Sequence, residues 1–160
     1  MADVLIFLGS PNDLAQMAKA RNTLDELGIS SSLHIVSAHR DPERVSELVR
    51  SAEEAGDVKV IIAGAGMAAH LAGTVAARTV LPVIGVPLSG SPLGGADALF
   101  STDQMPSGIP VATVGIDGAS NAAILAAEII GLSRPEVQRS LQNLRLRDRD
   151  KARGESARLA

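Results

Sequence analysis

The sequence predicts an α/β fold in which helices cover both faces of one parallel β-sheet. Short apolar runs of strand length alternate with longer segments whose apolar residues recur every three or four positions. This alternation is typical of βαβ units, which place strands side by side in a parallel sheet. Apolar residues make up 46% of the 160-residue chain, which fits one domain with a sizeable core.

Five strands are expected where runs rich in Val, Ile and Leu are bounded by turn residues, at 3–8, 31–36, 58–63, 81–86 and 110–116. Helices are expected at 14–27, 42–55, 67–78, 119–130 and 135–149, with a short helical segment ending near residue 102. Asp41 is a typical N-cap, and Pro42 suits the first helical position. With the first strand near the middle of the sheet, the arrangement is a three-layer, flavodoxin-like α/β/α fold.

Residues 1–149 are expected to form the single domain, with a charged C-terminal helix that extends from it. The tail, residues 150–160, is charged and rich in small residues, and is expected to be disordered. The helix predicted at 67–78 has almost no polar face, which is typical of a helix buried all round. We therefore expect a homo-oligomer built partly on this helix and on the Ala-rich helix at 119–130; close packing within one chain is the alternative.

Composition excludes several classes of function. The net charge of −3 gives no reason to expect nucleic acid or a membrane surface as a partner. Phe7 and Phe100 are the only aromatic residues, so stacking platforms for bases or flavins are scarce. Without cysteine there is no disulfide, thiolate nucleophile or iron–sulfur site. The first residues lack the basic segment of a signal peptide, and no apolar run reaches bilayer length, so a soluble cytoplasmic protein is expected.

The stretch after the second predicted strand carries the main candidate site. His39 and Arg40 stand side by side between that strand and the next helix. In a parallel sheet this junction lies at the carboxyl edge, where ligands bind. An imidazole and a permanent cation there can supply a proton shuttle and an anion anchor. Solvated loop residues are the plainer interpretation.

Two further turns should reach the same edge. The turn at 9–13 offers hydroxyl, amide and carboxylate groups at the start of a helix, which suits a phosphate or a sugar. The turn at 64–69 matches the dinucleotide pattern G-x-G-x-x-A, but the acidic residue expected about 20 positions later is missing, so a dinucleotide is disfavoured. The long irregular region at 85–110 is a functional loop or a plain connection.

The absence of several catalytic motifs leaves acid–base chemistry without a cofactor as the expected type of reaction. There is no P-loop for ATP, no G-x-S-x-G elbow, and no H-E-x-x-H pattern or cysteine for zinc. His39 is the best candidate base for a reaction on a small anionic substrate. His34 lies inside a predicted strand and is interpreted as structural. For His70, a role in the site and a role in packing are given equal weight.

Four stretches of the sequence match a known family: Ser37-Ala38-His39-Arg40 with Pro42; Ile61 to Leu71, including Gly64-Ala65-Gly66 and Ala68-Ala69-His70-Leu71; Leu81 to Pro87; and Gln104-Met105-Pro106 with Gly108-Ile109-Pro110-Val111. Through these stretches the sequence resembles the N5-carboxyaminoimidazole ribonucleotide mutase family, the class I phosphoribosylaminoimidazole carboxylase catalytic subunits of purine biosynthesis. The resemblance extends to about Leu132.

The resemblance implies that a carboxyl group moves from nitrogen to C4 of the imidazole, with no metal, ATP or biotin. His39 would carry the proton. The residues implied to bind the substrate are Ser10, Asn12, Asp13, Ser37, Ala38, Arg40, Ala65, Gly66, His70 and Leu71. It also implies an octamer and a functional link to an ATP-dependent synthetase that makes the N5-carboxylated ribonucleotide.

Three residues depart from the family pattern. Asn12 replaces a serine, and Met67 and Ala72 stand where the family usually has glycine and proline. The change at Asn12 concerns affinity more than the type of reaction, and Met67 and Ala72 are expected beside the pocket. A direct carboxylase acting on aminoimidazole ribonucleotide and CO2 is the second hypothesis, and Arg40 and His70 favour the mutase over it. A non-catalytic nucleotide-binding module on the same fold is the third.

Overall fold

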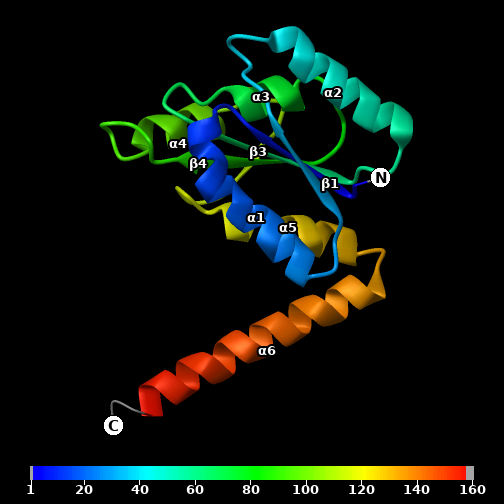
Figure 1. Cartoon of the computed structure of the whole chain (residues 1–160), viewed down its shortest axis with the longest axis vertical. Coiled ribbons are helices and arrows are strands. Elements are labelled where there is room, and N and C mark those ends of the chain that lie inside the picture. Colours follow the sequence, from blue (N-terminus) through cyan, green and yellow to red (C-terminus); the bar gives the residue numbers. More distant parts are fainter. Residues whose placement is uncertain (1, 158–160) are drawn as a thin grey trace.

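A parallel five-stranded sheet forms the centre of the computed structural model, which describes residues 2–157. The strands lie in the order β2-β1-β3-β4-β5 (Figure 1). Their bounds are β1 Val4–Leu8, β2 Ser31–Ile35, β3 Val60–Gly66, β4 Val83–Leu88 and β5 Ala112–Thr113. All pairings are parallel, and β1 lies between β2 and β3. The predicted flavodoxin-like fold is confirmed.

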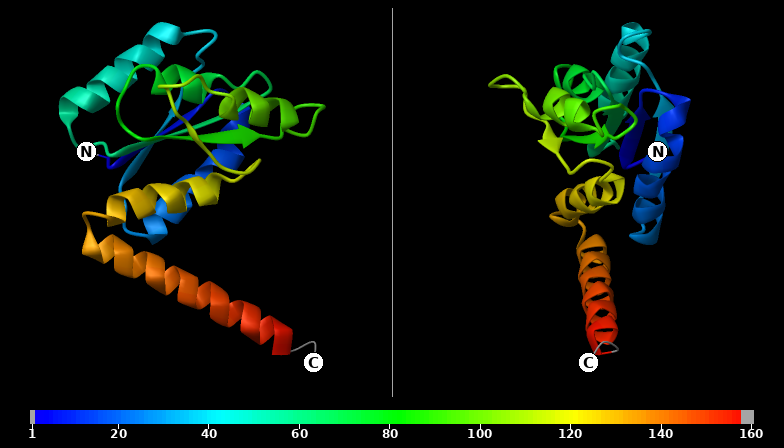
Figure 2. Two further views of the ribbon diagram at one scale, coloured as in Figure 1. Left: turned by 180° about the vertical axis from the view of Figure 1, so that it is seen from behind. Right: turned by 90° about the vertical axis from the view of Figure 1, so that its left-hand side faces the viewer.

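Helices cover both faces of the sheet. One face carries α1 (Leu14–Glu26) and α5 (Ala119–Gly131), which pack against each other. The other carries α2 (Pro42–Ala55), α3 (Leu71–Ala76) and α4 (Ala96–Asp103) (Figures 1 and 2). Because both faces are covered, β1 is apolar throughout: Ile6 and Leu8 enter the core under α1 and α5, and Phe7 the core on the other side.

Local signals position α2 as the sequence predicted. The Asp41 carboxylate accepts a hydrogen bond from the backbone N–H of Arg44 at 3.1 Å, and Pro42 occupies the first turn. Gly56 ends the helix in the left-handed region, with a φ of 72°. These caps fix where the β2–α2 turn ends, and this turn carries His39 and Arg40.

The helix expected at 67–78 is wrong at both ends, since α3 covers only Leu71–Ala76. β3 remains paired with β4 as far as Gly66 and Leu88, so the chain must turn before a helix can start. Met67 makes that turn with a φ of 57°. Leu71 and Val75 are buried against the chain's own core, so the domain itself supplies part of the burial expected from a partner.

The last strand is also shorter than the predicted 110–116, because β5 pairs only at Ala112 and Thr113. Beyond this point Pro87 of β4 has no N–H to donate toward β5. The Pro87 carbonyl still accepts a hydrogen bond from the N–H of Asp117 at 2.9 Å, so the chain continues alongside β4 without a regular ladder.

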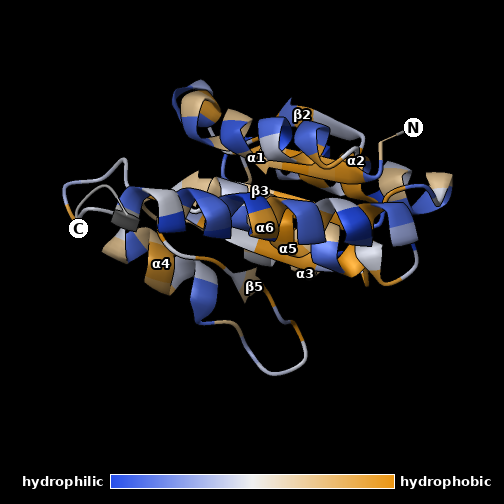
Figure 3. Ribbon diagram, turned by 90° about the horizontal axis from the view of Figure 1, so that it is seen from below, coloured by the Kyte–Doolittle hydropathy of each residue, from blue (hydrophilic) through white to orange (hydrophobic). Residues whose placement is uncertain are grey.

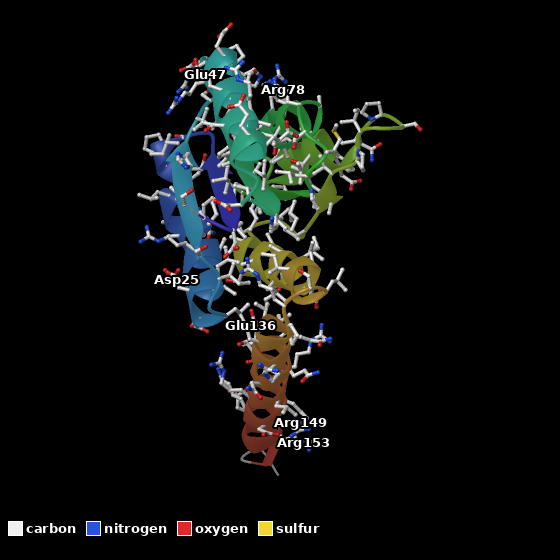
Figure 4. All side chains as sticks on the ribbon, turned by 90° about the vertical axis from the view of Figure 1, so that its right-hand side faces the viewer. Asp25, Glu47, Arg78, Glu136, Arg149 and Arg153 are labelled. Carbon is white, nitrogen blue, oxygen red and sulfur yellow. The ribbon has the colours of Figure 1, made fainter. Side chains whose placement is uncertain are left out.

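The C-terminal helix α6 runs from Pro135 to Ala157, beyond the expected end at residue 149. The expectation of disorder is therefore wrong for residues 150–157, most of which favour helix. Residues 158–160 lie outside the described residues. Val137 and Leu141 pack on the core, whereas Arg149 and Arg153 lie on the part that projects away (Figures 2 and 4). The helix is mostly hydrophilic in the view of Figure 3. No described helix combines the length and apolar character required to cross a membrane.

Candidate active site at the carboxyl edge

The turns that follow β1, β2 and β3 meet in one cavity of about 410 Å³. Because β1 lies between β2 and β3, the three turns are neighbours at the carboxyl edge. All residues that the sequence and the resemblance named as site residues line this cavity: Ser10, Asn12, Asp13, Ser37, Ala38, His39, Arg40, Ala65, Gly66, His70 and Leu71. The structure thus brings the candidates together, whatever role each has.

Four further lining residues were not among the site residues named from the sequence: Gly9, Met67, Ala68 and Gly90. The first three lie within turns that the sequence had singled out, so inspection of the whole turns would have included them. Gly90 comes from the long irregular region after β4, and no local motif points to it. The only signal for Gly90 in the sequence is that its region follows a strand and so begins at the same edge of the sheet.

The turn after β1 is held at both ends. The Gly9 N–H donates to the Gly64 carbonyl at 3.2 Å, which ties the turn to β3. Ser10 caps a short 3₁₀ turn, with its Oγ accepting from the Asn12 N–H at 3.2 Å. Asp13 is partly buried, and this desolvation raises the pKa of its carboxyl, although a hydrogen bond from the Ser10 backbone acts in the opposite direction.

The turn after β2 presents His39 and Arg40. The Ser37 carbonyl accepts hydrogen bonds from the N–H groups of Arg40, at 3.2 Å, and Asp41, at 2.8 Å. This folds residues 37–41 into a tight turn that ends at the α2 cap. His39 and Arg40 are exposed in the single chain, and both line the cavity.

The rings of His39 and His70, which both line the cavity, are in direct contact. Their centroids lie 3.8 Å apart, with an interplanar angle of 45°. Burial lowers the pKa of His70, the nearby His39 lowers it further, and a hydrogen bond with the Ala68 backbone opposes these effects. His70 is therefore held toward its neutral form beside His39.

Packing explains Gly64, which lies within β3. A Cβ on Gly64 would lie 2.2 Å from the Met17 Sδ, so this glycine allows α1 to approach the sheet. Because α3 begins only at Leu71, no helix N-terminus follows Gly66 directly as a dinucleotide site requires. The pattern G-x-G-x-x-A here reflects packing and a turn.

His34 lies away from the cavity, inside β2 as predicted. Its Nε2 lies 3.1 Å from the Ser32 Oγ, and its ring meets Phe7 edge-on at 5.9 Å. Burial and the positive charge of Arg44 lower its pKa. Within residues 2–157, no group of three or more His, Asp or Glu side chains is arranged to hold a metal ion.

Comparison with known proteins identifies the family. Residues 3–151 match the family described as "AIR carboxylase". The chain belongs to the AIR carboxylase family. This membership confirms the resemblance drawn from the SAHR and AAHL stretches.

Members of the AIR carboxylase family resemble the chain over most of its length. It is 52% identical to the N5-carboxyaminoimidazole ribonucleotide mutase of Pyrococcus abyssi, over 91% of this chain and 83% of the relative. Identity to the mutase of Thermotoga maritima is 53%, over 92% and 85% of the two chains. The crystal structure of Treponema denticola PurE has a TM-score of 0.90 and 31% identity, covering 98% of this chain and 97% of that one.

A longer relative carries the same unit. The phosphoribosylaminoimidazole carboxylase of Schizosaccharomyces pombe is 50% identical over 86% of this chain, which corresponds to 25% of that protein. AIR carboxylase domains thus occur both as short chains and within larger proteins.

Proposed function

We propose that this protein is an N5-carboxyaminoimidazole ribonucleotide mutase of de novo purine biosynthesis, which forms 4-carboxy-5-aminoimidazole ribonucleotide. The observation that carries the proposal is the cavity that His39 and Arg40 line together with the Ser10 turn. Identity above 50% to relatives named as this mutase, over most of both chains, supports the same reaction.

Substrate binding is assigned to polar groups around the cavity. Arg40, Ser10 and Asp13 bind the ribose phosphate portion, and Asn12 adds an amide to this set. The remaining lining residues shape the pocket for the imidazole and for CO2: Ser37, Ala38, Ala65, Gly66, His70 and Leu71.

The reaction requires one proton to be given and one to be taken. The C–N bond of the carbamate breaks, its electron pair remains on nitrogen, and that nitrogen receives a proton from His39. The CO2 released stays in the cavity, where C4 attacks it and a C–C bond forms. His39 then removes the proton from C4, which restores its starting state. Because the substrate already contains the carboxyl group, the chemistry needs no ATP, biotin, metal or other cofactor.

We further propose that the mutase is a soluble cytoplasmic homo-oligomer, an octamer, whose substrate comes from an ATP-dependent synthetase. Val80 is 99% exposed and Leu132 is 88% exposed in the single chain, and Leu93 and Phe100 are also uncovered. Contacts between subunits would remove these apolar side chains from water. Sedimentation equilibrium of the purified protein tests the octamer, and a monomer would exclude it.

Direct carboxylation of aminoimidazole ribonucleotide is the second candidate, since the Schizosaccharomyces pombe relative is named as a carboxylase. An absorbance assay for 4-carboxy-5-aminoimidazole ribonucleotide distinguishes the two. One reaction starts from the N5-carboxylated ribonucleotide, the other from aminoimidazole ribonucleotide with bicarbonate. Efficient turnover of the first supports the mutase. Efficient turnover of the second alone supports the carboxylase, and binding without turnover of either would indicate a nucleotide-binding module.

A further inference from the structure

The loop at 89–95 brings Gly90 to the cavity, and Asp117 holds the start of this loop. The Ser89 Oγ donates to the Asp117 Oδ2 at 2.6 Å, and the Ser89 N–H donates to the Asp117 Oδ1 at 3.0 Å. One residue of the loop therefore engages both oxygens of the carboxylate. Such charge-assisted pairs are stronger than neutral hydrogen bonds.

Asp117 itself is fixed by the backbone. Its N–H donates to the Pro87 carbonyl at 2.9 Å, and its carbonyl accepts from the Ala119 N–H at 2.9 Å. Its φ of 57° lies in the left-handed region, which aspartate adopts more readily than most residues. The carboxylate thus projects from a set position between β5 and α5.

The far end of the loop returns to the same place. Gly95 has a φ of +90°, and a Cβ on it would lie 2.7 Å from the Ile116 Cγ2 and 3.1 Å from the Ser89 Cα. The loop is therefore closed at its base, against residues 116 and 117. Ser89 and Asp117 lie outside the described residues that line the cavity, and the loop that begins at Ser89 connects Asp117 to the cavity through Gly90.

We propose that Asp117 is a positioning residue, which latches Ser89 so that the Gly90 backbone forms part of the wall around the bound ribonucleotide. This inference rests on the proposed function for the identity of the ligand. A loop that contains Gly90, Gly94 and Gly95 has many conformations available when it is released. Without the latch, substrate binding would have to order the loop, which weakens binding.

The experiment compares variants that remove all or part of the contact between Asp117 and Ser89. Asp117→Gly removes the carboxylate but tolerates the positive φ, and Asp117→Asn keeps an acceptor oxygen and also tolerates that φ. Ser89→Ala removes the hydroxyl and leaves the backbone bond. Ser101→Ala is the matched control, because it deletes a hydroxyl that donates to the Asp97 carbonyl at 2.7 Å on the exposed side of α4.

We expect Asp117→Gly to raise the KM for the N5-carboxylated ribonucleotide about tenfold with little change in kcat, and Ser89→Ala to raise it less. Asp117→Asn should recover part of the loss, and the double variant Ser89→Ala/Asp117→Gly should be no worse than Asp117→Gly. Hydrogen exchange of the amides at 89–95 should be faster in Asp117→Gly than in wild type and Ser101→Ala. If Asp117→Gly fails to fold, KM and hydrogen exchange at 89–95 are measured on Ser89→Ala in its place.

An unchanged exchange rate at 89–95 would overturn the latch, and so would faster exchange with an unchanged KM. A fall in kcat with KM unchanged would also overturn it, since the role proposed is in binding. Absence of turnover by the wild-type protein would instead contradict the proposed function, and hydrogen exchange would then decide on the latch by itself.

Discussion

The imidazole rings of His39 and His70 lie with their centroids 3.8 Å apart, although they come from turns after different strands. Two rings at this distance cannot both carry a positive charge without strong repulsion. The pKa of His70 is lowered by burial and by its neighbour, so His70 is the ring held neutral. The role of proton carrier in the proposed reaction is assigned to the other ring, that of His39, which lines the same cavity.

His39→Asn should keep the fold and reduce turnover at least about 100-fold, because general acid–base catalysis contributes on this scale. The absorbance assay measures turnover, and circular dichroism with a thermal melt checks the fold. His34→Asn is the matched control, since His34 lies in β2 outside the cavity. A His39→Asn variant with a rate near that of wild type would remove His39 from the mechanism.

Stability should fall on mild acidification because the pKa values of His34 and His70 are both lowered from 6.5 in the folded chain. The unfolded chain then binds more protons than the folded chain as the pH drops below about 6.5, which favours unfolding. Thermal melts at about pH 7.5 and 5.5, at one protein concentration, measure the loss. The His70→Asn variant should lose less stability than wild type between these pH values. An equal loss of stability would contradict the lowered pKa of His70.

Arg134→Met should destabilise the fold by about 1–2 kcal/mol at neutral pH. Arg134 donates a hydrogen bond to the Asp3 carboxylate, which with Ser30 lowers the pKa of Asp3 from 3.8 to about 2. This contribution is present above about pH 4 and is lost as the pH falls through 3.8 toward 2. Denaturant titrations at pH values in and above this range measure it.

Arg147→Met is the control for this pair. Arg147 also meets a carboxylate, that of Glu26, at 3.3 Å, but both side chains are about two-thirds exposed. Its loss should cost no more than about 0.5 kcal/mol. Equal effects for Arg134 and Arg147 would show that the burial of the Asp3 pair adds nothing.

Met67→Gly should raise the free energy of unfolding by about 0.5–1 kcal/mol. Met67 has a φ of 57°, and its side chain is 61% exposed, so little packing is lost on its removal. Glycine adopts this conformation without strain, and the greater freedom of the unfolded chain offsets only part of the gain. Met67→Ala keeps the strain and should show no gain in a denaturant titration. If Met67→Ala gained as much stability, the cause would be removal of the methionine side chain and not relief of backbone strain.

Local patterns in the sequence were enough to predict the order of the elements and the parallel sheet. Hydrophobic periodicity identified the strands, and the Asp41–Pro42 cap placed the start of α2 correctly. The positions of the three site turns followed, because the carboxyl ends of parallel strands share one edge. Strand order was harder, yet a first strand placed near the middle led to the observed order.

By itself, the sequence determined which residues stand at the carboxyl edge, since strand and cap signals act over a few neighbouring positions. Only the tertiary structure decided that His39 touches His70, that Asp117 holds Ser89, and that α3 and β5 are short. These features depend on the register of strands distant in the chain, such as Gly66 opposite Leu88, and on where Pro87 interrupts the ladder. Such long-range packing leaves no periodic mark within any single segment.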